Sequence, residues 1–99
     1  LGLKHGFGTH NYLGGSKYTG EFQGGYRQGQ GTLIYTDGSK YVGEFRAGLR
    51  NGYGSFFSQD GSKYEGEFKL GLKHGYGVFT DKNGNKTAGE WFNSQQLIN

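Results

Sequence analysis

The 99-residue chain contains no cysteine, no proline and no methionine, and only 31% of its residues are hydrophobic. Without cysteine it has neither disulfides nor thiol chemistry, which fits a reducing compartment and leads us to expect a cytoplasmic protein. No apolar run approaches the ~18 residues needed to span a bilayer, and no signal-peptide pattern is present. The hydrophobic supply is small for a two-layer core, so we expect a thin, elongated fold.

Glycine is in large excess, with 22 residues against an average usage of about 7%. Collagen is excluded because proline is absent and glycine does not fall at every third position. Disorder is disfavoured because 17% of the residues are aromatic. The remaining explanation is a repeat that needs many special backbone positions.

Three phrases recur with a period of 23 residues and never change register. The first phrase has the form Tyr-x-Gly-Glu-Phe and begins at Tyr18, Tyr41 and Tyr64, with Thr87 in the fourth place. The second is Gly-x-Gly, at 6–8, 29–31, 52–54 and 75–77. The third is a turn, at 14–17, 37–40, 60–63 and 83–86.

Each unit reads as a β-hairpin, with one strand from Tyr18 to about Gln23 and a second from about Gln30 to Tyr35. Asp-Gly and Asn-Gly predict tight turns, and the loop 36–38 suits a type I turn followed by a left-handed glycine. We take 25–28 as the other loop. No segment shows a helical period. The predicted fold is all-β: a single twisted antiparallel meander of stacked hairpins, open and elongated. Its parts are a partial repeat at 1–17, repeats at 18–40, 41–63 and 64–86, and a partial repeat with a tail at 87–99.

Strand alternation assigns the two faces of this sheet. With the loop at 25–28, Phe22 lies opposite Gly31, and Tyr18 lies opposite Tyr35. Rings can then lie flat over bare glycine backbone, which explains glycine in the middle of strands despite its entropic cost. The expected aromatic spine comprises Tyr18, Phe22, Leu33, Tyr41, Phe45, Phe56, Tyr64, Phe68, Phe79 and Trp91.

The combination of Tyr-x-Gly-Glu-Phe/Trp, Gly-x-Gly and Asp-Gly resembles the MORN (membrane occupation and recognition nexus) repeat, up to about Phe92. The resemblance implies a twisted sheet of stacked hairpins, used as a scaffold for protein assembly or for attachment near membranes. Departures from the pattern are Thr87 in place of Tyr, and Gln28 and Asn51 where His5 and His74 stand.

Basic residues form two periodic series. One precedes each first strand and comprises Lys17, Lys40, Lys63 and Lys86. The other falls in the glycine-bracketed loops and comprises Lys4, Arg27, Arg50 and Lys73. Two readings stay open: solvated residues that keep the sheet soluble, or a surface for anionic lipid head groups. Nucleic acid is not expected as a partner, because the net charge is only +3.

Aromatic residues also occur on the second face of the predicted sheet. Phe7, Tyr53 and Tyr76 occupy the middle of Gly-x-Gly, and Phe57 lies four residues beyond Tyr53. If solvent reaches this face, it is an apolar strip for a protein partner; otherwise sheet coiling buries it. The neighbouring glutamates favour a helix or peptide that carries basic residues, and they comprise Glu21, Glu44, Glu67 and Glu90.

The residues predict no catalytic, metal or cofactor site. No helix follows Gly-x-Gly, as a nucleotide-binding loop requires. His5, His10 and His74 are too scattered for a dedicated zinc site. The glutamates recur in similar surroundings, whereas a catalytic pair needs one special environment. We therefore expect neither an enzyme nor a bound cofactor.

The segment Leu1–Gly6 recurs identically at Leu70–Gly75, so the chain begins in mid-repeat. We expect a piece of a longer protein whose open sheet ends allow homo-oligomers, with residues 92–99 folding back as a cap through Leu97 and Ile98. The predicted function is a scaffold that binds a protein partner. The alternatives are a membrane-surface module for anionic phospholipids, placing the protein at the membrane or cytoskeleton, and a regulatory segment of an enzyme whose catalytic domain lies elsewhere.

Overall fold

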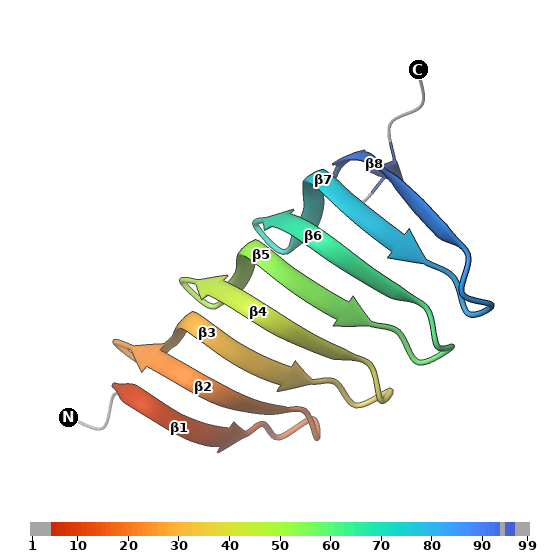
Figure 1. The fold of residues 1–99 in the computed structure, drawn as a ribbon. Helices are drawn as coiled ribbons and strands as arrows, with labels where there is room; N and C mark the ends of the chain where they lie inside the picture. The colour runs from red at the N-terminus through yellow and green to blue at the C-terminus, as the bar shows by residue number, and fades with distance from the viewer. Residues whose placement is uncertain (1–4, 94, 97–99) are drawn as a thin grey trace.

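The computed structural model describes residues 5–93 and 95–96, and all regular structure within them is β-strand. The strands form one antiparallel sheet in chain order (Figure 1), which confirms the predicted meander. The sheet is elongated, with extents of 50 × 23 × 17 Å. Its strands are β1 (Gly6–Asn11), β2 (Lys17–Gln23), β3 (Tyr26–Ile34), β4 (Lys40–Arg46), β5 (Leu49–Phe57), β6 (Lys63–Lys69), β7 (Leu72–Thr80), β8 (Lys86–Phe92) and β9 (Gln95–Gln96).

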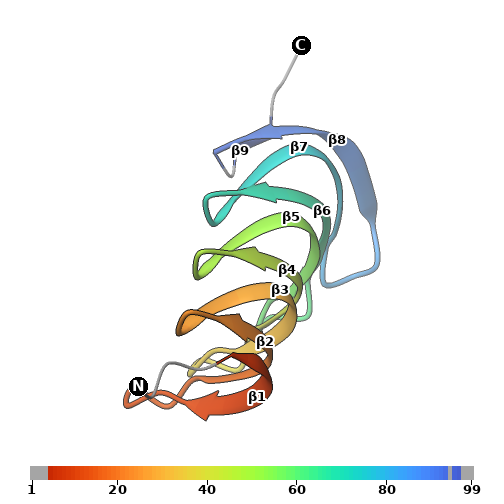
Figure 2. The same ribbon diagram turned by 90° about the vertical axis from the view of Figure 1, so that its left-hand side faces the viewer.

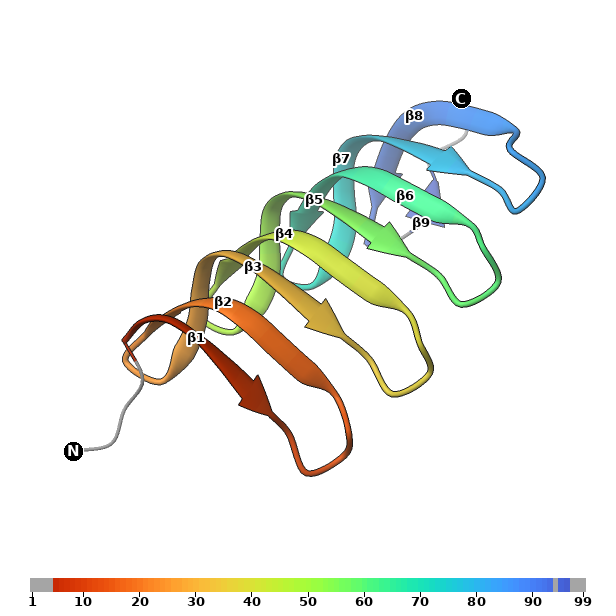
Figure 3. The same ribbon diagram turned by 60° about the horizontal axis from the view of Figure 1, so that its bottom comes forward.

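A row of glycines crosses the sheet, one from each strand between β1 and β8. Each glycine pairs directly with the glycine of the next strand, so the row is continuous. Figures 2 and 3 show that the strands which this row crosses are arched. We call it the glycine row; it comprises Gly8, Gly20, Gly31, Gly43, Gly54, Gly66, Gly77 and Gly89.

The face of the sheet towards which these glycines point is filled by tyrosine rings that lie directly on the glycine row. A Cβ on Gly54 would stand 2.2 Å from Tyr41 Oη and 2.4 Å from Tyr41 Cζ. The Tyr41 hydroxyl donates to the Glu44 carbonyl oxygen at 2.8 Å. Tyr18 over Gly31 and Tyr64 over Gly77 repeat both contacts. These tyrosines are fully buried although the sheet has a single layer.

Phenylalanines connect the tyrosines into one core. The Phe45 ring meets Tyr18 at 5.1 Å and Tyr41 at 5.0 Å between centroids, both edge to face. Such pairs contribute about 0.5–1.5 kcal/mol beyond the area they bury. The buried part of the predicted spine is confirmed, and comprises Tyr18, Phe22, Leu33, Tyr41, Phe45, Tyr64 and Phe68. Phe56, Phe79 and Trp91 are partly buried against it, as are Tyr12 and Tyr35, which the prediction omitted.

The predicted pairing within the hairpin was wrong by four residues at Phe22, next to the turn, and by two at Tyr18, beyond the bulge between Gly20 and Phe22. Phe22 pairs with Arg27 rather than with Gly31, and Tyr18 pairs with Leu33 rather than with Tyr35. The cause is the loop: the chain turns at 24–25, where both glycines have positive φ (58° and 87°), so 26–28 belong to β3. A two-residue turn of this kind matches the strand twist. Phe22 and Gly31 still face the same side, but Tyr18 covers the bare backbone.

The later tight turns carry weaker sequence signals. Ala47 and Leu70 occupy the first turn position with φ of 50° and 52°, a conformation that costs a residue with a side chain about 1–2 kcal/mol. The Asp-Gly loop is as predicted: Gly38 has φ of 91°, and its N–H donates to the Tyr35 carbonyl at 3.0 Å. Hydrogen bonds from Ser39 hold the pKa of Asp37 below its ordinary value.

The chain also folds back after β8, as the predicted cap requires. Residues of β9 pair antiparallel with β8 at Trp91 and Phe92. Leu97 and Ile98, which were expected to complete the cap, lie outside the described residues.

Adding a methyl group to the glycine row is expected to destabilise the sheet. In Gly54→Ala the new Cβ displaces the Tyr41 ring, so the free energy of unfolding falls by about 1–3 kcal/mol. Gly14→Ala is the matched control, because nothing lies within 4 Å of that Cβ; its effect stays within about 0.5 kcal/mol. Urea unfolding followed by circular dichroism measures both. Equal effects of the two variants would contradict the packing of tyrosine on glycine.

Relieving the left-handed turn residue is expected to stabilise the protein. Ala47→Gly removes the cost of φ at 50° but adds backbone entropy, for a net gain of about 0.5–1 kcal/mol. Ala88→Gly, in the middle of β8, carries the entropy cost alone and loses about 0.5–1 kcal/mol. Opposite signs in the same urea titration are the expected result; a loss in both variants would show that the turn is not strained.

The buried tyrosines make the fold sensitive to alkali. Burial raises the pKa of Tyr64 to about 12, from an ordinary 10.0, and raises the pKa of Tyr18 and Tyr41 as well. The unfolded chain releases these protons first, so stability is complete below pH 10 and falls as the pH rises towards 12. Tyrosinate absorbance and circular dichroism, recorded together during an alkaline titration, are expected to change in one step. Tyr64→Phe should reduce the steepness of the loss; an unchanged slope would contradict the assignment.

Candidate functional site

The face opposite the tyrosine core carries three rows of side chains that run along the long axis of the sheet. The first, the tyrosine–glutamate row, comprises Phe7, Glu21, Gln30, Glu44, Tyr53, Glu67, Tyr76 and Glu90. The central row comprises Thr9, Thr19, Thr32, Val42, Ser55, Glu65, Val78 and Ala88. The lysine row comprises Asn11, Lys17, Ile34, Lys40, Phe57, Lys63, Thr80 and Lys86.

The aromatic strip expected on this face is open to solvent. Phe7 is 77% exposed, Tyr53 63% and Tyr76 62%. Phe57 was grouped with them but lies in the lysine row, where the Lys40 Nζ approaches its ring centroid to 4.9 Å and the Lys63 Nζ to 5.9 Å. The strip on this face therefore consists of the first-row aromatics alone.

The glutamates of the first row have a structural role that the sequence analysis missed. The Glu44 carboxylate accepts a hydrogen bond from the Tyr53 N–H at 3.3 Å, across a bulge in the β4–β5 pair. Beneath it, Gly52 has φ of 97°, and a Cβ there would stand 1.9 Å from Glu44 Oε1. Glu21 and Glu67 bind the N–H groups of Gln30 and Tyr76 in the same way. The fixed spacing between Glu and the first glycine of Gly-x-Gly was the available signal.

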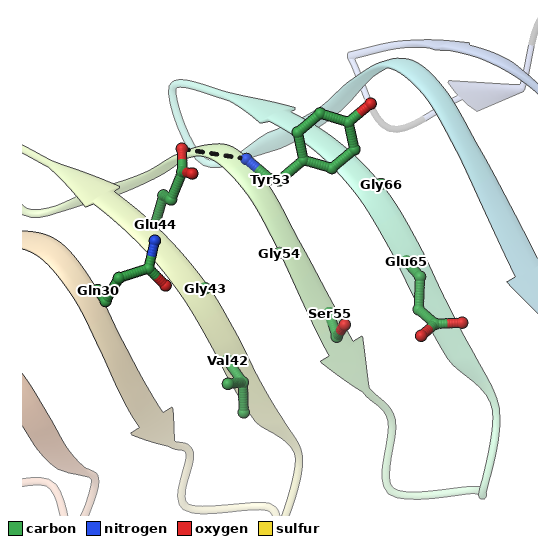
Figure 4. Close-up of a pocket in the computed structure, with 9 residues that line it drawn as sticks. All are labelled: Gln30, Val42, Gly43, Glu44, Tyr53, Gly54, Ser55, Glu65 and Gly66. Atoms are coloured by element: carbon green, nitrogen blue, oxygen red, sulfur yellow. Dashed lines mark hydrogen bonds between the residues drawn. The ribbon is translucent and has the colours of Figure 1, made fainter.

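Between the first and central rows, the outer face is hollow above the backbone of the glycine row, whose missing side chains would point to the opposite, tyrosine-bearing face. One hollow, of about 390 Å³, is lined by Gln30, Val42, Gly43, Glu44, Tyr53, Gly54, Ser55, Glu65 and Gly66 (Figure 4). The next, of about 230 Å³, is lined by Tyr53, Glu65, Gly66, Tyr76, Gly77, Val78 and Ala88. The two share Tyr53, Glu65 and Gly66, so they join into one shallow depression, which we call the glycine groove.

The glycine groove has a mostly apolar surface, and the charged side chains that line it are acidic. Glu44 and Glu65 line it, and none of its lining residues is basic. Lys63, from the lysine row, pairs with Glu65 at 3.4 Å, and both side chains are partly exposed. Arg46 and Lys69 line a separate hollow on the other side of Tyr53. This arrangement suits an apolar segment that presents a cation to the groove.

The two basic series lie on opposite faces of the sheet. The lysines at 17, 40, 63 and 86 form the lysine row, whereas Arg27, Arg50 and Lys73 lie against core rings. The Arg50 guanidinium is 5.3 Å from the Phe68 centroid, and the Lys73 Nζ is 4.9 Å from Trp91. The two series therefore do not share a surface. Lys4 lies outside the described residues.

The arginines join consecutive repeats. The Arg27 guanidinium donates to the Gly48 carbonyl, and the Arg27 carbonyl accepts from the Gly48 N–H at 3.0 Å. Arg50 holds Gly71 in the same manner. Each arginine thus clamps the tight turn of the following repeat.

A second contact at each tight turn explains why one repeat position varies. The Ala47 N–H donates to Gln28 Oε1 at 3.0 Å, and the Leu70 N–H donates to Asn51 Oδ1 at 3.2 Å. In the first unit, His5 Nδ1 accepts from the Gly24 N–H at 3.4 Å. The position requires a hydrogen-bond acceptor rather than a histidine.

Residues 5–93 and 95–96 hold no group of three or more metal-ligating side chains that could bind an ion. A search of the same residues for a helix long and apolar enough to cross a membrane finds none.

The similarity of this chain to known proteins lies in its 23-residue repeat. No curated protein matches the chain. The family model of the MORN repeat matches three consecutive segments, 18–40, 41–63 and 64–86. Repeats of this family are generally binding or scaffold modules and are typically non-catalytic. With its core contacts, bulges and turns repeating over these segments, the chain belongs to the MORN repeat family.

Proposed function

We propose that the chain is a non-catalytic binding module that engages a protein segment along the glycine groove. The observation that carries this proposal is the exposure of Tyr53 and Tyr76, at 63% and 62%, beside a continuous apolar hollow. Tyrosine is a favoured interface residue, because it offers a large apolar surface with a polar tip at a low cost in conformational entropy.

The groove is also held in place before any partner binds. Its floor is backbone from the middle of the sheet, and the backbone of Tyr53 is fixed by the hydrogen bond to Glu44. A preformed surface spends little of its binding energy on ordering itself. The contact to Tyr76 through Glu67 repeats this support one hairpin later.

Repetition supports binding over catalysis. Glu44 and Glu67 make equivalent backbone contacts at equivalent positions, whereas a general acid and base need environments that separate their pKa values. An array of like sites favours a partner that spans several of them.

Removing the two tyrosines tests the proposal. The double variant Tyr53→Ala/Tyr76→Ala is expected to weaken retention of groove-binding peptides, selected from a displayed random library, by tenfold or more. The tyrosines are solvent-exposed, so the thermal unfolding curve should stay close to that of the unaltered chain. Tyr26→Ala is the matched control, because Tyr26 is 62% exposed but lies at the tight turn, outside the groove.

The expected result is loss of binding in the double variant and none in Tyr26→Ala. Peptides that bind all three folded proteins equally would show that the glycine groove is not the binding surface.

A further inference from the structure

We propose that the glycine groove receives a proline-rich segment in the polyproline II conformation, carrying a lysine or arginine that pairs with Glu65. This inference rests on the proposed function and specifies the occupant. It is carried by the width and pitch of the groove, by the paired backbone of its floor and by its charge.

The groove is about as wide as one extended chain. Its sides, such as Tyr53 and Ser55, stand two residues apart on one strand, a separation of about 7 Å. An α-helix with its side chains is about 10–12 Å wide. A helix would therefore rest on the rims of the depression, whereas a single extended chain reaches its floor.

The backbone beneath the groove excludes recognition by strand addition. Strands β4 to β7 each pair with a neighbour on both sides. Their N–H and C=O groups are therefore already used, and a partner strand has no ladder to join. A polyproline II segment needs no such ladder, because it has no internal hydrogen bonds and is recognised through its side chains.

The pitch of the repeat matches that conformation. Tyr53 and Tyr76 come from strands two apart, β5 and β7, so their backbones are separated by about 9.6 Å, given a strand spacing of ~4.8 Å. Polyproline II has three residues per turn and a rise of ~3.1 Å, which gives about 9.3 Å per turn. In an extended strand, residues on one side recur every ~6.7 Å, which does not match the spacing of the two tyrosines. Every third residue of a polyproline II segment therefore meets an equivalent point of the groove.

The space between the two tyrosines suits a proline ring. The hollow of about 230 Å³ has Tyr53 and Tyr76 along one side, Val78 and Ala88 along the other, and Gly66 and Gly77 as its floor. Glu67, which lies between them in the first row, is turned away, because its carboxylate is bound to the Tyr76 N–H at 3.2 Å. Pyrrolidine rings packing between aromatic rings are the usual mode of polyproline recognition.

The negative charge of Glu65 favours a lysine or arginine in the bound segment. Glu65 lines both hollows, and its carboxylate forms an exposed ion pair with the Lys63 Nζ at 3.4 Å. An exposed pair of this kind contributes little, so a partner guanidinium that binds the carboxylate in bidentate fashion can replace Lys63. Glu44, at the other end of the larger hollow, adds to the preference for a basic segment.

The test is a competition between two displayed peptide libraries on the immobilised chain. One library has proline at every third position and the other has alanine there; all other positions are random. We expect the proline library to be enriched tenfold or more over the alanine library, with lysine or arginine overrepresented, and this enrichment to vanish on Tyr53→Ala/Tyr76→Ala.

On Glu65→Gln the preference for basic residues should disappear, whereas Lys63→Gln should strengthen binding several-fold. Tyr26→Ala should behave as the unaltered chain, and circular dichroism verifies that each variant is folded.

Enrichment of the alanine library in a manner that depends on Tyr53 and Tyr76 would overturn the polyproline assignment and leave the binding module in place. Enrichment of acidic rather than basic residues would overturn the role of Glu65. Enrichment of neither library above the double-variant background would overturn both the assignment and the proposed function.

Discussion

The fold depends on the contact between a tyrosine ring and the bare backbone of a glycine on the next strand. A sheet of one layer has no second layer to bury its apolar face, yet Tyr18, Tyr41 and Tyr64 are fully buried. The ring lies on the glycine, and the tyrosine hydroxyl donates to the carbonyl of the glutamate three residues later. Phenylalanines then join successive tyrosines edge to face. Burial that normally requires two packed layers is achieved within one.

The opposite face of the sheet carries the candidate binding surface. Absence of side chains along the glycine row admits the tyrosine rings on the core face, whereas the outer hollow lies above the backbone between the side chains of Tyr53 and Ser55. Glutamates at the bulges fix the backbone of the exposed aromatics. The core and the candidate binding surface thus lie on opposite faces of the same strands.

Much of this arrangement was predictable from the sequence, because the period is strict and alternation assigns the faces. The meander and the buried members of the spine followed from these two regularities. The hairpin register was mispredicted, since the chain turns at Gly24 and Gly25 rather than over 25–28, and a bulge between Gly20 and Phe22 then shifts the pairing. Of the candidate binding residues, Tyr53 and Tyr76 lie on the second face as expected and are exposed, an outcome that the sequence left open, whereas Arg27 and Arg50 lie against the core. Composition cannot distinguish a cation that faces solvent from one that covers a ring, because that depends on the register.

The clamps between repeats also bear on how the chain reaches its fold. Arg27 and Gly48 are 21 residues apart, as are Arg50 and Gly71, and every strand pairs only with its immediate neighbours in sequence. Contacts in this all-β chain are therefore short in sequence separation, and each loop that must close costs the same modest entropy. Such a topology folds faster than sandwiches or barrels of similar strand content. A growing array can add one completed hairpin at a time to the preceding one, without waiting for a distant partner strand.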